Sequence, residues 1–466
     1  MSQSNPPLLE GATRDLAAFA AGLKYDQIPA VVVERLKTSV LDSIGCCVFG
    51  VTLPWTRKVQ SMVEEEGGAP VASIFGSGRK SSVSGAVLIN ATAGHAFELD
   101  DIHKESIVHP GSIALPVALA LAEKTGRRRG KDIIAALAAG YEIGTRVGNA
   151  ATMSLFFRGF HPQGTSGVFV AAATAAHMLQ LDARQTQHAL GIVGSQAGGL
   201  MAAQEGAMVK RFHSGRAAQS GVYAALLAQN DFTGIVDVLE ASYGGYLSSY
   251  SDKPNPRRLT DDLGRVWETG TIGYKPHASV TSIHAALDAL ASIMRDKRLE
   301  PADIAAVDVG VSHMTHVHCA WPYKAQGVTA AQMNLYYGLA VIAFDGVAFV
   351  DQYREDRLND PRIFDFIARI NARVDPDIDA MGPAFRHAAR VAVTTADGRR
   401  FEKEILHRRG SPENPLSQAD VEHKFRNVVH SCLAPQAIDD IVALSKRLDQ
   451  IDDVQPLLDI LAAPSA

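Results

Sequence analysis

The chain has 466 residues, of which 47% are hydrophobic and 20% are charged. This share of apolar residues excludes an intrinsically disordered chain, and the length suits two domains or one large domain with an insertion. With 45 Lys and Arg against 50 Asp and Glu, the net charge of −5 offers no basic field for nucleic acid or for a membrane surface. A small anionic substrate remains compatible with this charge, because it needs only a locally positive pocket.

The four cysteines form no CxxC pair and are too few for a disulfide scaffold, which indicates reduced, mostly buried thiols. The first nine residues have neither a basic segment nor an apolar core, and no run of about 18 apolar residues occurs. We therefore expect a soluble, cytoplasmic protein that binds neither nucleic acid nor a membrane.

The first 270 residues predict helices. Apolar residues recur at spacings of three and four in 16–23 and 31–48, and the Ala-rich segments 165–179 and 215–229 have small residues where helices could pack closely. Little of this region alternates with period two and no strand–helix unit repeats, so neither a large sheet nor a doubly wound fold is expected.

The pattern changes near Trp267. Residues 304–312 are typical of a strand, and 389–394 and 401–406 flank an Ala-Asp-Gly turn, which predicts a β-hairpin. The segments expected to be helical in this region are 334–349 and 357–374.

After the Gly/Pro turn at 410–415, helices resume at 419–432 and 435–447. The sequence therefore predicts a mainly α fold with two domains. The first is a discontinuous all-helical domain of residues 1–268 and 405–466. The second is a smaller α+β lid domain of residues 269–404.

The first polar cluster is GHAFELDDIH at 94–103, followed by HPGS at 109–112. Three acids and three histidines within fifteen residues suit acid–base chemistry, in which a carboxylate orients a histidine and tunes it. A polar helix end is the structural alternative. A metal site is disfavoured, because the spacing matches neither HExxH nor an EF-hand loop.

Two further clusters precede Ala-rich helices. In FHPQGTSG at 160–167, backbone N–H groups could face an anion with His161 at the rim, or the segment could simply start a helix. In KRFHSGR at 210–216, Lys210 or Arg216 could point inward as a base or a carboxylate clamp, or the segment could be a solvated turn.

Other features narrow the class of protein. YKPH at 274–277 opens the α+β unit, and Tyr336-Tyr337 lies in an apolar helix, where each hydroxyl needs a partner. The histidines around Cys319 do not fit a closed zinc pattern. The sequence contains no dinucleotide fingerprint, phosphate loop or nucleophile elbow. We expect no organic cofactor, and a pocket of His, Lys, Tyr and acids between two domains that is suited to removing a proton beside a carboxylate.

The order and spacing of these motifs resemble the MmgE/PrpD family. The resemblance runs from about residue 10 to 450 and rests on GHAFELDDIH…HPG, GFHPQGTSG, MVKRFHSGRAA, YKPHAS…H and GSPENPLS. The family includes 2-methylcitrate dehydratases, cis-aconitate decarboxylases and iminodisuccinate epimerase. The resemblance implies a large helical domain, a smaller lid domain, a homodimer, and an enzyme that needs no metal or organic cofactor.

The resemblance also implies site residues. The expected catalytic residues are the two histidines His109 and His161, the lysine Lys210, and a tyrosine reaching in from the lid, Tyr337. His161 and Lys210 are the candidates for the base and its electrostatic partner, with His109 acting on the opposite face. The residues expected to shape the pocket or bind the substrate are Asp100, Asp101, Gly164, Arg216, Lys275 and His277.

Some positions depart from the family pattern. Glu98 and Ile102 stand where the decarboxylases have Asp and Thr, the loop before His109 is one residue longer, and His277 follows Lys275-Pro276 where dehydratase-like members often have Cys or Arg. The lost Thr hydroxyl mildly favours an epimerase, which protonates no leaving group. We therefore predict an iminodisuccinate-epimerase-like enzyme acting beside a carboxylate of a small di- or tricarboxylate. The alternatives are a 2-methylcitrate dehydratase-like lyase and a non-catalytic polycarboxylate-binding protein.

Overall fold

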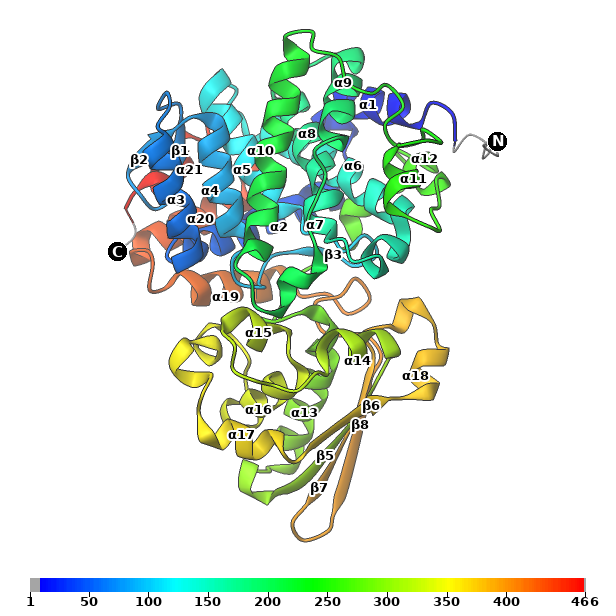
Figure 1. Cartoon of the computed structure of the whole chain (residues 1–466). Coiled ribbons are helices and arrows are strands. Elements are labelled where there is room, and N and C mark those ends of the chain that lie inside the picture. The colour runs from blue at the N-terminus through cyan, green and yellow to red at the C-terminus, as the bar shows by residue number, and fades with distance from the viewer. Residues whose placement is uncertain (1–8, 465–466) are drawn as a thin grey trace.

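The computed structural model describes residues 9–464 and consists of a helical body next to a smaller α+β unit (Figure 1). The mainly α fold predicted from the sequence is therefore confirmed. The first stretch of the body contains α1 (Ala12–Gly22), α2 (Ala30–Gly50), α3 (Pro54–Glu66), α4 (Val83–Gly94), α5 (Gly111–Thr125), α6 (Gly130–Phe157), α7 (Pro162–Thr165), α8 (Gly167–Met178), α9 (Ala183–Gly194), α10 (Val209–Gln229), α11 (Tyr246–Tyr250) and α12 (Arg257–Thr260).

The chain returns to the body after the α+β unit, with α19 (Gln418–Val429), α20 (Pro435–Lys446) and α21 (Gln455–Ala462). Both α19 and α20 pack against α2, and the buried Lys424 on α19 donates a hydrogen bond of 2.7 Å to Asp42 on α2. The first and last parts of the chain thus share one core. The only strands of the body's described residues are short: β1 (Ala72–Ile74) pairs with β2 (Arg79–Ser81), and β3 is Ile102–His103.

Helix α8 forms the centre of the body. All of its residues are buried, and it packs against α5, α6, α9 and α10, which explains why its sequence is apolar on every face. Glycines allow the closest approaches. A Cβ on Gly144 of α6 would lie 2.1 Å from Val170, and a Cβ on Gly221 of α10 would lie 2.2 Å from Ala171. The Ala- and Gly-rich composition therefore reflects tight helix packing.

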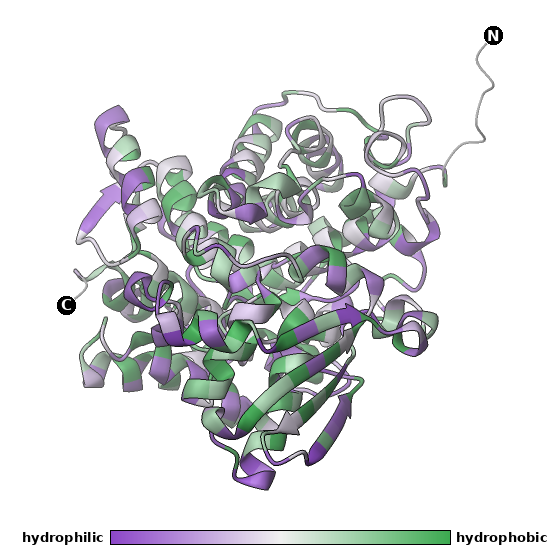
Figure 2. Cartoon of the chain, turned by 60° about the horizontal axis from the view of Figure 1, so that its bottom comes forward, coloured by the Kyte–Doolittle hydropathy of each residue, from purple (hydrophilic) through white to green (hydrophobic). Residues whose placement is uncertain are grey.

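The α+β unit is built on a four-stranded sheet with the order β6-β5-β7-β8. The strands are β5 (Ile304–Val311), β6 (Ile370–Val374), β7 (Ala389–Thr395) and β8 (Arg400–Ile405), and its helices are α13 (His284–Lys297), α14 (His313–Cys319), α15 (Val328–Met333), α16 (Leu335–Asp345), α17 (Pro361–Ile367) and α18 (Pro376–Ala380). Helix α13 packs on β7 and β8, and α16 packs on α13. In Figure 2, hydrophobic and hydrophilic residues both occur along the strands and helices of this unit.

The predicted strand at 304–312 and the predicted hairpin are confirmed as β5, β7 and β8. The helix predicted over 357–374 is wrong in its second half. Only Pro361–Ile367 is helical, and Ile370–Val374 is strand β6, which pairs in parallel with β5. Exposure alternates along β6, so its pattern is that of a half-buried strand at the edge of a sheet.

The two parts of the molecule meet at a short pair of strands. β3 pairs in antiparallel fashion with β4 (Ile272–Gly273), which lies just before the α+β unit begins. On the other side of the junction, α15 contacts the 3₁₀ turn η2 (Met201–Glu205) of the body. Among the described residues, no single helix is long and apolar enough to cross a membrane, and α2 with α3 meets that criterion only as a pair bent by 80°.

The close packing of α10 on α8 predicts a stability effect. Gly221→Val should lower the free energy of unfolding by about 1–3 kcal/mol, because the new side chain must displace Ala171 in a dense core. Urea unfolding followed by circular dichroism measures this loss. The matched control is Gly22→Val at the end of α1, where no neighbouring atom lies within 4 Å of the added Cβ. Equal stability of the two variants would contradict the packing argument.

Candidate active site

A pocket lies at the junction of the helical body and the α+β unit. The body contributes Glu98, Ile102, Lys104, Ile107, His109, Phe156, His161, Met201 and Lys210. The α+β side contributes Lys275, Val280, Thr281, Ser282, Met314, His318, Met333 and His387. The pocket therefore combines a cationic lining with an apolar one, and it forms only when both parts of the chain are folded together.

The loop between α4 and α5 forms one wall of this pocket. Two of its residues, Glu98 and Ile107, have a left-handed backbone with φ of 56°, and both line the pocket. This conformation is uncommon outside glycine and is a true outlier for a β-branched residue. Such strain persists only where surrounding contacts hold the backbone in place, and it concentrates at functional sites.

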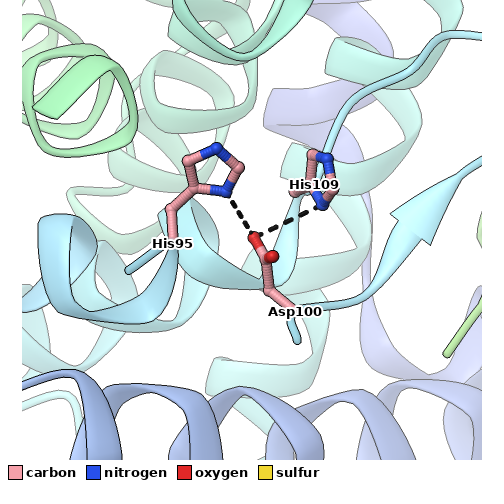
Figure 3. A group of neighbouring side chains, drawn as sticks. All are labelled: His95, Asp100 and His109. Carbon is pink, nitrogen blue, oxygen red and sulfur yellow. Dashed lines mark hydrogen bonds and ion pairs between the residues drawn. The ribbon is translucent and has the colours of Figure 1, made fainter. Parts of the chain in front are cut away.

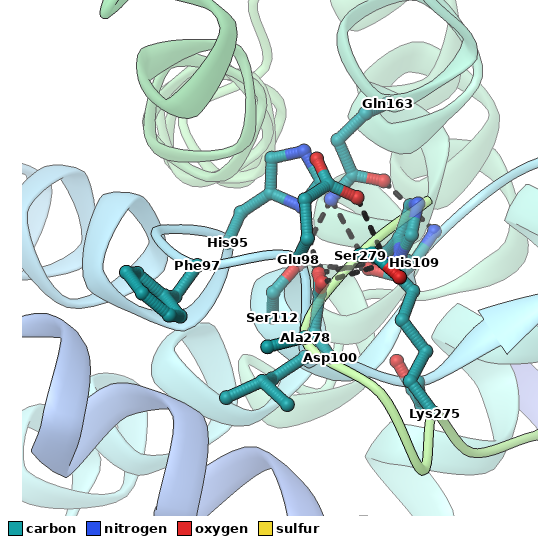
Figure 4. Close-up of polar contacts among 12 residues, drawn as sticks. His95, Phe97, Glu98, Asp100, His109, Ser112, Gln163, Lys275, Ala278 and Ser279 are labelled. Carbon is teal, nitrogen blue, oxygen red and sulfur yellow. Dashed lines mark hydrogen bonds and ion pairs between the residues drawn. The ribbon is translucent and has the colours of Figure 1, made fainter. Parts of the chain in front are cut away.

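The carboxylate of Glu98 is buried among three cations. It accepts hydrogen bonds from Lys210 and from Arg211 at 2.6 Å. It also accepts one from Lys275 at 3.0 Å, and Figure 4 shows Glu98 and Lys275. Burial alone would raise the pKa of Glu98, but the charges of Lys210, Lys275 and Arg211 hold it well below the usual range. Burial lowers the pKa of Lys210 to about 8, although Glu98 opposes this shift. Lys210 can therefore lose or gain a proton near neutral pH.

A second buried carboxylate holds two histidines. Asp100 Oδ2 lies 2.7 Å from His95 Nδ1 and 3.4 Å from His109 Nδ1 (Figure 3). Burial would raise the pKa of Asp100, but His109 and His95 keep it well below its ordinary value. Because Nδ1 of His109 faces Asp100, its other ring nitrogen is left for the pocket that this histidine lines.

The main chain of His109 is fixed by Gln163 of α7. The His109 N–H donates to Gln163 Oε1 at 2.8 Å, and Gln163 Nε2 donates to the His109 carbonyl at 3.1 Å (Figure 4). Gln163 also donates to Ser112 and Ser214, on α5 and α10. One amide thus ties three helices to the position of the catalytic candidate His109.

His161 lies at the start of α7 and pairs with another histidine. Its Nδ1 is 2.9 Å from Nδ1 of His213 on α10, so one ring donates and the other accepts. Burial, and then the charge of Lys210, hold the pKa of His161 well below its ordinary value. His161 is therefore neutral at pH 7 and can accept a proton or a hydrogen bond.

Within residues 9–464, one group of side chains has its possible metal-ligating atoms close together: those of His95, Asp100 and His109 lie within 4.8 Å of one another. The ammonium group of Lys275 is 3.8 Å from Asp100 Oδ1, and it would repel a bound cation. The geometry suits a carboxylate that is hydrogen-bonded to His95 and near His109 better than a metal centre. His313 and His316 do not join this group.

Residues 14–258 match the MmgE/PrpD N-terminal domain, and residues 277–450 match the MmgE/PrpD C-terminal domain. The chain belongs to the MmgE/PrpD family. A cis-aconitate decarboxylase of Aspergillus terreus is 32% identical over 477 residues, covering 97% of this chain and 96% of the relative. The cis-aconitate decarboxylase of Homo sapiens is 27% identical over 482 residues, covering 98% of this chain and 96% of the relative.

This MmgE/PrpD protein is therefore an enzyme, of the isomerase or lyase class. The family predicted from the motifs is confirmed. The relatives are named as decarboxylases, which are lyases, and none of those found is named as an epimerase. The comparisons thus support the lyase alternative better than the epimerase favoured by the sequence.

The structure brings four of the residues predicted for the site, His109, His161, Lys210 and Lys275, together in one pocket. Asp100 lies behind this lining, where it orients histidines and does not face the substrate.

Asp101, expected in the pocket wall, lies deeper still. It accepts hydrogen bonds from the Gly111 N–H at 3.0 Å and from the Tyr141 hydroxyl at 2.8 Å. The predicted contact of Asp101 with the substrate is therefore corrected to a structural role at the start of α5.

Four other predicted residues do not line the pocket. The Tyr337 hydroxyl donates to the Gln352 carbonyl inside the α+β unit, where its ring is fully buried. Arg216 is on the exposed side of α10, where it donates a hydrogen bond to Gln219. It therefore does not share the inward side of the helix with Lys210.

The other two are held by local hydrogen bonds. His277 Nε2 lies 2.9 Å from Asp288 Oδ1 on α13, which turns its ring into the α+β unit. The Gly164 N–H donates to the His161 carbonyl at 3.0 Å, so the turn itself uses the amide expected to bind an anion. The Gly164 amide is therefore not free to bind an anion, contrary to the prediction from the sequence.

Several residues of the site were not predicted from the sequence. Arg211, Gln163 and His213 lie within the quoted motifs, but their neighbours Lys210, His161 and Arg216 were chosen instead. The side of α10 that faces inward could have been deduced only from its partners in space. Lys104 directly follows the GHAFELDDIH segment, His318 lies next to Cys319 and His387 lies in no motif; only folding brings the three together.

The environment of Asp101 predicts an unusual response to pH. Burial raises the pKa of Asp101 to about 8, and Asp42 adds to this effect, so the folded protein holds a proton there that the unfolded chain releases near pH 4. The stabilising effect of this proton is complete below pH 4 and is lost as the pH rises to about 8. Each pH unit in this window lowers the free energy of unfolding by up to about 1.4 kcal/mol.

In Asp101→Asn the side chain keeps its shape but stays neutral at every pH. The stability of this variant relative to that of the wild type should therefore rise between pH 5 and pH 8. Thermal unfolding at several pH values measures the difference. The neighbouring Asp100→Asn is the control, because Asp100 is ionised in the fold, and this variant should be less stable than wild type throughout. A constant difference between Asp101→Asn and wild type would show that Asp101 is ionised when folded.

Proposed function

We propose that the chain is a lyase that removes CO₂ from a small unsaturated polycarboxylate of the cis-aconitate type. The observation that carries this proposal is the charge of the pocket. Of the ionisable residues that line it, three are lysines, four are histidines and one, Glu98, is an acid. A ligand with two or three carboxylates would balance this positive charge. The full-length similarity to two cis-aconitate decarboxylases supports the same substrate class.

Decarboxylation breaks a carbon–carbon bond, and the electron pair left behind must be delocalised and then protonated. In cis-aconitate, the carbon that bears one carboxylate adjoins a double bond, so the pair can shift and a proton can add at the far carbon. The reaction therefore consumes one proton for each CO₂ released. The Lys210 ammonium, with a pKa of about 8, is mostly protonated at pH 7 and can donate this proton.

Other groups of the site would bind and orient the substrate. Lys275 and neutral His161 offer hydrogen bonds to carboxylates, and His109 is held by Asp100 as a second acid or base. The apolar side of the pocket, with Phe156, Met201, Met314 and Met333, would surround the departing carboxylate. Because a poorly solvated carboxylate loses CO₂ more readily, this mixed lining favours decarboxylation.

The homodimer and the cytoplasmic location expected from the sequence stay predictions. The exposed apolar side chains Val209, Tyr223 and Leu227 on α10 are where we would expect a second copy to bind.

The direct test is incubation of the purified enzyme with cis-aconitate in D₂O. We expect CO₂ release and one deuterium on the product carbon, detected by NMR. Lys210→Ala and His161→Ala should each lower kcat by about 10²–10⁴-fold with the fold intact. Arg216→Ala, on the same helix but outside the pocket, should keep wild-type activity. Proton exchange without CO₂ release from candidate dicarboxylates would instead favour the epimerase, and loss of water from a hydroxy acid would favour a dehydratase.

A second prediction concerns the proton donor. If the ammonium form of Lys210 is required, kcat should fall as the pH rises through about 8. Glu98→Gln removes a charge that raises the pKa of Lys210, so the falling limb should move down by about one pH unit. The pH dependence of kcat in both proteins measures this shift, with Glu402→Gln on exposed β8 as control. A rate that rises through pH 8 would make Lys210 the base instead.

A further inference from the structure

A second group of cations lies at the end of the pocket formed with the α+β unit. Lys104 and His387 line the pocket there, and Arg386 and Arg408 lie close to them. All four side chains are buried, with exposed fractions of 8%, 8%, 4% and 1%, respectively. This group is separate from the Glu98 network, and no step of the proposed reaction uses it.

Arg408 has too few partners for a buried guanidinium. Among residues 9–464, its Nε and Nη2 make no hydrogen bond, and no carboxylate lies within 4 Å of it. Its one hydrogen bond, to the Arg409 carbonyl, is long at 3.5 Å. Burial lowers the pKa of Arg408 to about 10, so the group still carries its charge at neutral pH. A buried charge without a partner is strongly unfavourable and requires an explanation.

Arg408 lies next to the wall of the pocket. Its Nη2 lies 3.4 Å from the place where a Cβ on Gly273 would be. Gly273 of β4 pairs with Ile102 of β3, and Ile102 lines the pocket. The guanidinium therefore lies behind the strand pair that forms part of the pocket wall.

The neighbours of Arg408 do not neutralise it. Lys104 donates to Glu413 at 2.9 Å, and Arg386 lies 3.5 Å from Glu105, so these two cations use the two nearby acids. The charge of Asp288 also raises the pKa of Arg408, but Asp288 is paired with His277. Nδ1 of His387 has no partner within the described chain either. The cluster therefore has an excess of positive charge, and some of its N–H groups have no hydrogen-bond acceptor among the described residues.

We propose that this end of the pocket is a second carboxylate-binding subsite, in which Lys104 and His387 contact the anion and Arg408 supplies the balancing charge. The first subsite is formed by Lys210 and Lys275 at the other end. A polycarboxylate would bridge the two and so connect the helical body with the α+β unit. The choice of a carboxylate as the anion rests on the proposed function.

The test uses propane-1,2,3-tricarboxylate, which resembles the proposed substrate but lacks its double bond. Its affinity for the wild type, Arg408→Met and His387→Phe is measured by isothermal titration calorimetry, and the melting temperature of each protein is measured without ligand. The matched control is Arg399→Met, which makes the same change at the exposed turn between β7 and β8.

We expect both variants to bind the tricarboxylate roughly 10- to 100-fold more weakly, because His387→Phe removes a hydrogen bond to a charged carboxylate and Arg408→Met removes the charge that balances it. Arg399→Met should bind as the wild type does. Without ligand, Arg408→Met should melt at the wild-type temperature or above, because it removes a buried charge that has no partner. A purely structural arginine would give the opposite result, a lower melting temperature.

The proposal is overturned if Arg408→Met binds the tricarboxylate within about threefold of the wild type, or if it melts several degrees lower. It is also overturned if the wild type does not bind the tricarboxylate. The measurement needs no turnover, so it separates the two proposals. A wild type that binds the tricarboxylate but releases no CO₂ from cis-aconitate refutes the lyase and keeps the subsite. A wild type that decarboxylates, with an unchanged KM in Arg408→Met, refutes the subsite alone.

Discussion

The buried carboxylate of Glu98 determines the shape of the site, because three cations from two parts of the chain converge on it. Lys210 and Arg211 come from α10 of the body, and Lys275 comes from the segment that opens the α+β unit. A lone carboxylate at this depth would be very costly, whereas one surrounded by cations is stable and holds them in place. The left-handed backbone of Glu98 is the local cost of this arrangement. Two of the three lysines that line the pocket, Lys210 and Lys275, thus depend on one acid for their position and charge.

Two adjacent acids show how strongly the environment sets protonation. Asp100 faces two histidines and Lys275, and it stays ionised. Asp101 faces Tyr141 and the start of α5 with another acid, Asp42, nearby, and its pKa is raised to about 8. The first holds the histidines of the site, and the second fills a hydrogen-bonding position in the core. The same side chain therefore takes two roles because of its neighbours.

The combination of apolar and cationic side chains gives the pocket its chemical character. The thioether and aromatic side chains come from both parts of the molecule, and so do the cations. A polycarboxylate bound there would have its charges held at the cationic ends and one bond kept away from water. The binding energy gained at the two ends of the ligand could then lower the barrier to a reaction at its middle.

The sequence by itself determined the helical class, three of the four strands in the sheet of the α+β unit, the family motifs and four residues of the pocket. Those features are local. Helical periodicity, strand alternation and the order of short motifs depend only on neighbours in the chain. The pocket residues His109, His161, Lys210 and Lys275 were found because each lies in a motif.

Tertiary structure decided which side of each motif faces inward. On α10, Arg211 is buried against Glu98 and Arg216 is exposed, a difference that depends on the packing of the whole helix. Residues 370–374 became a strand because β5 offered an edge to pair with. The cationic cluster around Arg408 joins segments slightly more than 300 residues apart, so no local pattern could reveal it. Burial and pairing across such distances are properties of the fold, and only they fix charge and protonation.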